Sequence, residues 1–110
     1  MQLFFIELEP FTRNAVRLDL EDDFRALEDQ LRENPAAGPL DPGTCGLRKI
    51  RMGTARWRRG KRFGARVHYY YVPARRVIYF LNLYLKEDQS TLTPDQKKML
   101  CALVAQFTAE

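Results

Sequence analysis

The sequence predicts an α+β domain in which helices pack on a small antiparallel β-sheet. Apolar residues recur at helical spacing between positions 20 and 31, and again between 99 and 107. Between these segments, three stretches have the alternating or continuous apolar character of strands. The chain has 110 residues, of which 45% are hydrophobic, so residues 1–110 are expected to form one domain.

The N-terminal third is expected to hold one strand and one helix. The apolar run at 3–6 predicts a first strand, which Pro10 ends. A helix should begin after Asp19, its expected N-cap, and end before Pro35. The apolar positions of this helix are Leu20, Phe24, Leu27 and Leu31. Residues 34–46 are rich in proline and glycine and predict a loop.

The middle of the chain predicts three strands. Residues 47–52 alternate, with Arg48, Ile50 and Met52 on one face and Leu47, Lys49 and Arg51 on the other. A basic loop at 53–64 leads to a Tyr- and Val-rich strand at 65–72. The almost continuous apolar run at 77–85 predicts a central strand buried on both faces. Since only a few residues separate the last two strands, they should form an antiparallel hairpin.

A final helix should begin at Thr93, which can form a capping box with Gln96, and Pro94 suits its first position. The apolar stripe of this helix is predicted at Met99, Leu100, Leu103, Val104 and Phe107.

The charge is distributed unevenly. Residues 42–86 contain twelve Lys and Arg and no Asp or Glu, whereas the rest of the chain carries fourteen acidic and six basic residues. An anionic partner would offset the repulsion within this basic segment, which is typical of a nucleic-acid-binding surface. The alternative is a solvated basic face without a partner.

The composition also excludes several kinds of site. One histidine and no CxxC or phosphate-binding glycine motif argue against a metal site or a nucleotide-binding loop, and no cofactor is expected. Cys45 and Cys101 are too few for a disulfide scaffold, so we expect inert thiols in a reduced, cytoplasmic protein. No segment has the length of a membrane span or the pattern of a signal peptide, so no membrane association is expected.

Basic side chains recur at every second position of the predicted strands. If the strand faces coincide, one concave surface would be lined by Lys49, Arg51, Arg66, Tyr84 and Lys86. Such a group could bind a phosphodiester and stabilise the negative charge that develops on it. The alternative is that these are ordinary outward-facing strand residues. His68 is more readily explained as a packed or hydrogen-bonded residue than as a catalytic one.

The basic loop interleaves cations with aromatic residues, as single-stranded RNA-binding segments do. Trp57 could stack on a base or anchor the loop, and Phe63 is better explained as an anchor. The residues expected to bind RNA or the ribosome are Arg48, Arg56, Trp57, Arg58, Arg59, Lys61 and Arg62.

Four segments in order have a familiar pattern: ENPAAG at 33–38, GTCGLRKIR at 43–51, GKRFGARVHYY at 60–70 and YFLNLYLKE at 79–87. Together they resemble HigB/RelE-type toxins of bacterial type II toxin–antitoxin pairs, within the RelE/ParE superfamily. The chain departs from the family pattern at Cys45, where the family has glycine, and it lacks a clear counterpart of a tyrosine in the family's final segment.

The resemblance implies a RelE-like microbial RNase-type fold and a metal-independent mRNA endoribonuclease, an mRNA interferase that inhibits translation. Such toxins cut mRNA in the ribosomal A site by attack of the RNA 2′-hydroxyl on the adjacent phosphate. By position, Arg66 matches an arginine that contacts the scissile phosphate. The remaining matched basic and tyrosine positions are Lys49, Arg51, Tyr84 and Lys86.

The resemblance also implies partners: the ribosome with its mRNA, and a cognate antitoxin with a DNA-binding domain, through which alone operator DNA would be contacted. Two alternatives remain open from the sequence. One is a ParE-like toxin that inhibits a protein target such as gyrase, and the other is a non-catalytic RNA- or ribosome-binding module.

Overall fold

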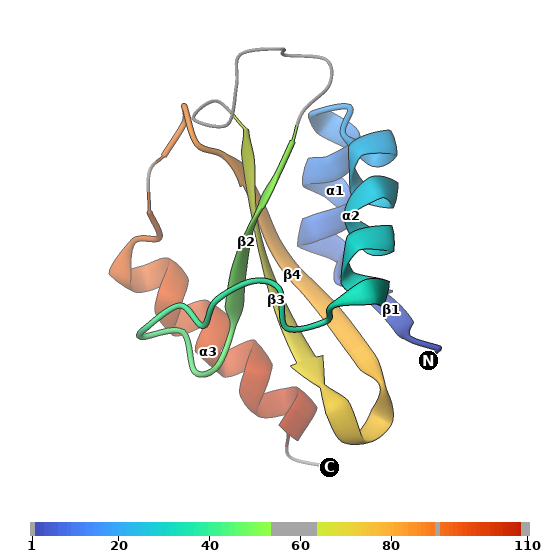
Figure 1. Ribbon diagram of the computed structural model, residues 1–110. Coiled ribbons are helices and arrows are strands. Elements are labelled where there is room, and N and C mark those ends of the chain that lie inside the picture. The colour runs from blue at the N-terminus through green and yellow to red at the C-terminus, as the bar shows by residue number, and fades with distance from the viewer. Residues whose placement is uncertain (1, 54–63, 90, 109–110) are drawn as a thin grey trace.

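The computed structural model describes residues 2–53, 64–89 and 91–108. A four-stranded sheet forms the centre, with α1 and α2 on one face and α3 on the other (Figure 1). The predicted α+β class is confirmed. The predicted order of one helix before the three middle strands is wrong, because two helices precede them.

The strands are β1 (Phe4–Glu7), β2 (Arg48–Met52), β3 (Ala65–Val72) and β4 (Val77–Leu85), in the spatial order β1-β4-β3-β2. The β2–β3 and β3–β4 pairs are antiparallel, as expected, whereas β1 runs parallel to β4. The sheet is therefore mixed, which corrects the expectation of a purely antiparallel one. The pattern of apolar residues in β1 indicates which side chains are buried. It does not indicate whether β1 runs parallel or antiparallel to β4, which lies some seventy residues later in the chain.

Helix α1 (Glu9–Arg17) was missed from the sequence because Pro10 was interpreted as a strand breaker. Proline is well tolerated in the first turn of a helix, where its missing N–H would have no intrahelical acceptor. Here Pro10 is the second residue of the helix, and Phe11 and Ala15 are buried against the sheet and α2.

Helix α2 (Glu21–Glu33) buries the apolar face that the sequence predicted. Its N-cap is Leu20 and not Asp19, which has φ 58° and lies in the left-handed region. The side chain of Leu20 makes no capping hydrogen bond. Three acidic residues in the first turn stabilise this end of the helix instead, through their interaction with the positive end of the helix dipole. The helix ends at Glu33, and its C-cap Asn34 is extended before Pro35, as expected.

Strands β3 and β4 form the predicted hairpin, joined by a short 3₁₀ turn at Pro73–Arg75. Strand β4 has neighbours on both sides and contributes to the packing on both faces of the sheet. The register shifts between His68 and Tyr69, so that Leu81 has no residue directly opposite. Leu81 lies in the cluster under α3, opposite to Phe80, and the bulge shifts the alternation so that Leu83 packs on the α1 and α2 side.

Helix α3 (Pro94–Thr108) starts with the predicted capping box. The Gln96 N–H donates to Thr93 Oγ1 at 3.1 Å, and the Thr93 N–H donates to Gln96 Oε1 at 2.9 Å. Leu100 and Val104 are buried, but Met99 is 59% exposed, so its place in the apolar stripe was wrong. None of the helices in the described ranges is long and apolar enough to cross a membrane.

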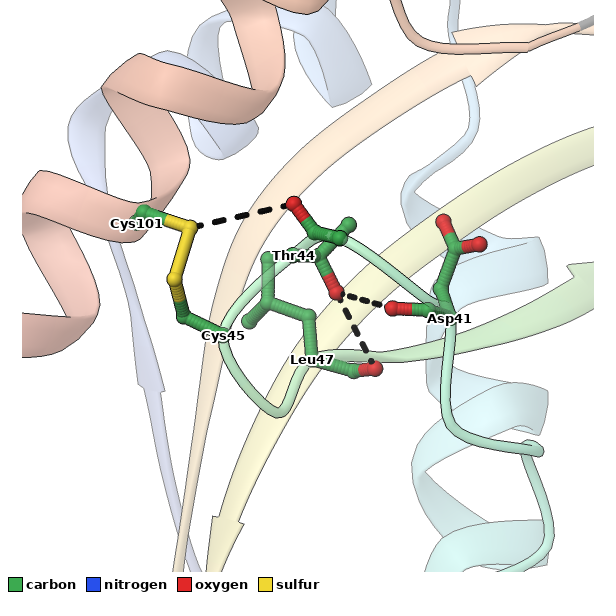
Figure 2. The surroundings of a disulfide bond; sticks show 6 residues. Asp41, Thr44, Cys45, Leu47 and Cys101 are labelled. Atoms are coloured by element: carbon green, nitrogen blue, oxygen red, sulfur yellow. Dashed lines mark hydrogen bonds between the residues drawn. A yellow bond between two sulfur atoms is a disulfide. The ribbon is translucent and has the colours of Figure 1, made fainter.

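Cys45 and Cys101 form a disulfide that joins the loop before β2 to α3 (Figure 2). The expectation of two inert, reduced thiols is therefore wrong. The two cysteines are 56 residues apart in the chain, and only the packing of α3 beside this loop brings their Cα atoms to 5.3 Å. No pattern in the local sequence signals that approach.

Candidate functional site: a basic depression on the sheet

Two rows of side chains cross β2, β3 and β4 on one face of the sheet. In the first row Arg51 lies opposite Arg66, and Arg66 lies opposite Tyr84. In the second row His68 lies between Lys49 and Asn82. Directly opposite residues in paired strands project to the same face. The strand faces therefore coincide, as the sequence analysis required for a shared surface.

The predicted cations meet in one depression with a volume of about 420 Å³. Its described lining consists of Pro39, Lys49, Ile50, Arg51, Arg66 and Lys86, and we call it the basic depression. All four predicted basic residues are thus brought together. Tyr84 is not part of this lining: it is only 7% exposed and lies beside Arg66 on the neighbouring strand.

Three separate parts of the chain build the depression. Strand β2 presents Lys49 and Arg51 two residues apart, and its outer edge is covered by the preceding loop, because the Lys49 N–H donates to the Pro39 carbonyl at 3.0 Å. Gly38 in this loop is needed for close approach, since a Cβ there would lie 3.0 Å from the Lys49 carbonyl oxygen. Lys86 follows β4, and its N–H donates to the Gly64 carbonyl just before β3.

Arg66 is 5% exposed and has no carboxylate partner among the described residues. Its Nη1 donates to the adjacent Ala65 carbonyl at 3.3 Å. Burial, followed by the neighbouring charge of Arg51, lowers the pKa of the Arg66 guanidinium. A guanidinium stays charged near neutral pH despite such a shift, so this positive charge is available to an anion.

Tyr84 lies beside this charge as an uncharged phenol. Burial raises the pKa of Tyr84, and the positive charge of Arg66 opposes that rise only in part. The Tyr84 hydroxyl is buried and has no hydrogen-bond partner among the described residues. It therefore retains a hydrogen-bond donor next to Arg66.

A buried Asp41–His68 pair lies in the second row. His68 is fully buried, and its Nε2 lies 2.9 Å from Asp41 Oδ2. Burial lowers the pKa of His68 below its ordinary value of 6.5, and the hydrogen bond and charge of Asp41 offset only part of that effect. A neutral His68 donates its Nε2 hydrogen to the carboxylate, which leaves Nδ1 buried without a partner in the described part of the chain.

Sequence reasoning expected His68 to be packed or hydrogen-bonded, and that is confirmed. It missed Asp41, the last acidic residue before the acid-free segment. The only available signal was an acid inside a Pro- and Gly-rich loop, a position usually explained by turn formation.

Other predicted binding residues are not brought to the depression. Arg48 lies on the opposite face of β2, and its guanidinium donates to the Gly38 carbonyl at 2.8 Å, which fastens the loop to the strand. The remaining predicted RNA contacts lie outside the described residues: Arg56, Trp57, Arg58, Arg59, Lys61 and Arg62.

The arrangement is suited to holding a phosphate group, because four cations converge and no carboxylate lines the described depression. Within the described ranges, no cluster of three or more His, Cys, Asp or Glu residues is placed to hold a metal ion. No model of a known protein family matches the chain.

Proposed function

We propose that this protein is the toxin of a toxin–antitoxin pair and acts as a ribosome-dependent, metal-independent mRNA endoribonuclease. The observation that carries the proposal is the convergence of Lys49, Arg51, Arg66 and Lys86 in one depression that no described carboxylate lines. A surface with this charge and shape favours a phosphodiester over a neutral or cationic ligand.

In the proposed reaction, the RNA 2′-oxygen bonds to the adjacent phosphorus while the bond from phosphorus to the 5′-oxygen breaks. The products are a 2′,3′-cyclic phosphate and a 5′-hydroxyl end, and the proton lost by the 2′-hydroxyl balances the one gained by the leaving oxygen. Arg66 and its neighbouring cations stabilise the extra negative charge on the phosphoryl oxygens in the transition state. Tyr84, uncharged and buried beside Arg66 outside the lining of the depression, is assigned the role of positioning Arg66.

The cognate antitoxin is proposed to cover the basic depression or to block docking on the ribosome. Such a partner would present acidic side chains to these cations, because charge complementarity steers association and suppresses wrong partners.

The test is to induce the wild-type chain and Arg66→Ala in bacteria and to map new mRNA 5′ ends. The matched control is Arg25→Ala, which removes one positive charge from α2, on the other side of the sheet. We expect cuts inside translated codons with the wild type and the control, and none with Arg66→Ala. Circular dichroism of the purified variants should show an unchanged fold.

Growth arrest with intact mRNA would overturn the nuclease proposal and favour inhibition of a protein target such as gyrase. RNA or ribosome binding without cleavage and without arrest would favour a non-catalytic RNA-binding module.

A further inference from the structure

The disulfide lies at the surface of the molecule, where a thiol can reach it. Cys45 is exposed, and Cys101 on α3 is partly exposed. Both cysteines of the chain take part in this bridge, so a reductant has no other target in the protein. Exposed disulfides are the ones that exchange readily with thiols.

The bridge holds a loop whose backbone is unfavourable by itself. We call residues 38–47 the clamp loop. Cys45 has φ 63°, in the left-handed region that side chains with a Cβ rarely adopt, and it lies between Gly43 at φ 80° and Gly46 at φ 98°. A conformation of this kind persists when surrounding contacts impose it. The covalent bond from Cys45 to α3 is one such contact.

Hydrogen bonds within the clamp loop connect the residue next to Cys45 to Asp41. The Thr44 hydroxyl donates to the Asp41 carbonyl at 2.6 Å and lies 3.5 Å from the Leu47 carbonyl (Figure 2). The Asp41 N–H in turn donates to the Leu47 carbonyl at 2.9 Å. Both ends of the clamp loop's turn are thereby fixed, with the Asp41 carboxylate held against His68.

The clamp loop also forms part of the basic depression. Pro39 lines it, and the Pro39 carbonyl accepts the hydrogen bond from the backbone of Lys49. His68 lies directly opposite Lys49 in the register, and its ring is stacked on that of Tyr84 with centroids 6.0 Å apart. A displacement of the clamp loop would therefore change the depression in two ways. It would move Pro39 at the edge of the depression, and it would disturb His68, which lies opposite Lys49, through the loss of the Asp41 contact.

We propose that the Cys45–Cys101 disulfide is a redox-sensitive clamp: its reduction releases the clamp loop, separates Asp41 from His68 and loosens the Pro39 wall of the basic depression. A dithiol reductant supplies the two electrons and two protons. A thiolate of the reductant attacks one sulfur of the bridge, which forms a mixed disulfide and releases the first cysteine. The second thiol of the reductant then attacks the reductant sulfur of this mixed disulfide. The second cysteine is released, and the reductant leaves as a cyclic disulfide. Cys45 and Cys101 are left as thiols.

The sheet and the α1–α2 pair are expected to keep their structure when the bridge is reduced. The clamp loop contributes one fully buried residue, Leu47, to the smaller hydrophobic cluster beneath α3, and none to the larger cluster between the sheet and the α1–α2 pair. Strands β3 and β4 pair with each other along their length, and neither strand contains a cysteine. Reduction should therefore open the loop locally and leave the sheet intact.

His68 is the single histidine of the chain and provides a specific probe. The experiment is to follow its imidazole signals by NMR in ¹⁵N-histidine-labelled protein, before and after reduction with dithiothreitol, over a pH titration. The ionisable groups facing the ring are Asp41 from the clamp loop, Lys49 from β2 and Tyr84 from β4. On reduction we expect the His68 pKa to rise toward its ordinary value of 6.5, because opening the loop admits water to the ring.

Backbone hydrogen exchange gives a second readout. The Asp41 and Lys49 amides, which donate to Leu47 and Pro39, should exchange at least about tenfold faster after reduction. The β3 and β4 amides should stay protected and exchange faster only as far as the lower free energy of unfolding requires. The double variant Cys45→Ser/Cys101→Ser should match the reduced wild type and should not respond to the reductant. Asp41→Asn keeps the bridge and should alter the His68 signals without speeding exchange at Lys49.

Unchanged His68 titration and exchange after complete reduction, verified by alkylation and mass spectrometry, would overturn the clamp. Global loss of exchange protection would also overturn it and would identify the bridge as a structural staple. Neither readout involves RNA. Failure of the proposed nuclease function would therefore appear separately, as absence of mRNA cleavage in both redox states.

Discussion

At the scale of single residues, the basic depression concentrates positive charge that the described chain does not neutralise. Arg51 is exposed at its rim, whereas Arg66 is nearly buried within it. For single-stranded nucleic acid, each phosphate contact contributes a slope of about −0.7 to the dependence of log affinity on log salt. We expect Arg51→Gln to weaken binding of single-stranded RNA and to reduce this slope by about that amount. Fluorescence anisotropy at several salt concentrations would check it, with Arg25→Gln as the unaffected control. An unchanged slope would remove Arg51 from the contact surface.

The buried His68 makes stability depend on pH. Burial lowers its pKa in the folded protein, so between that value and about 6.5 the unfolded chain binds more protons and stability falls as pH falls. The stabilisation is complete above pH 6.5, and below it up to about 1.4 kcal/mol is lost per pH unit. Thermal unfolding between pH 7 and 5 should show a steeper loss for the wild type than for His68→Leu. Equal slopes would show that His68 does not carry the effect.

At the scale of elements, the capping box determines where α3 begins. Thr93→Ala removes the hydroxyl that accepts the Gln96 N–H, and we expect it to lower the free energy of unfolding by about 1 kcal/mol. Thr91→Ala is the matched control, because Thr91 is exposed and, among the described residues, its side chain makes no hydrogen bond; its backbone carbonyl accepts one from Gln89. Urea unfolding of the two variants would measure the difference. Similar losses for both would show that the cap does not stabilise the helix measurably.

The elements also show where local patterns predict structure and where they do not. The 77–85 run and the capping box depend on burial and on contacts within one turn, and both were predicted correctly. The interpretation of Pro10 as a strand breaker was wrong because proline is found both at the ends of strands and in the first turn of helices. Which of the two structures forms here depended on the packing of Phe11 against the core. The prediction that Met99 is buried was wrong because α3 packs on the sheet along a narrower face than its sequence pattern suggests.

At the scale of the whole molecule, the disulfide joins two residues that are 56 positions apart, and the segment between them includes β2, β3 and β4. Chain-entropy arithmetic for a loop of this length gives about 4 kcal/mol of stabilisation through the unfolded state. We therefore expect Cys45→Ser/Cys101→Ser to lower the free energy of unfolding by about that amount under non-reducing conditions, measured by urea denaturation. Under reducing conditions the wild type should be as unstable as the variant. A difference between the two in reductant would mean that the serines act by another route.

The sequence by itself determined the α+β class, the antiparallel hairpin, and the basic residues that share a strand face. These follow from side-chain periodicity, which depends only on neighbours within a few positions. Only the tertiary structure decided the register that sets Arg51 opposite Arg66 and Tyr84, the parallel pairing of β1, the Asp41–His68 contact and the Cys45–Cys101 bridge. Each of these joins segments far apart in the chain. Their geometry depends on how the helices and the sheet pack together, which no local pattern encodes.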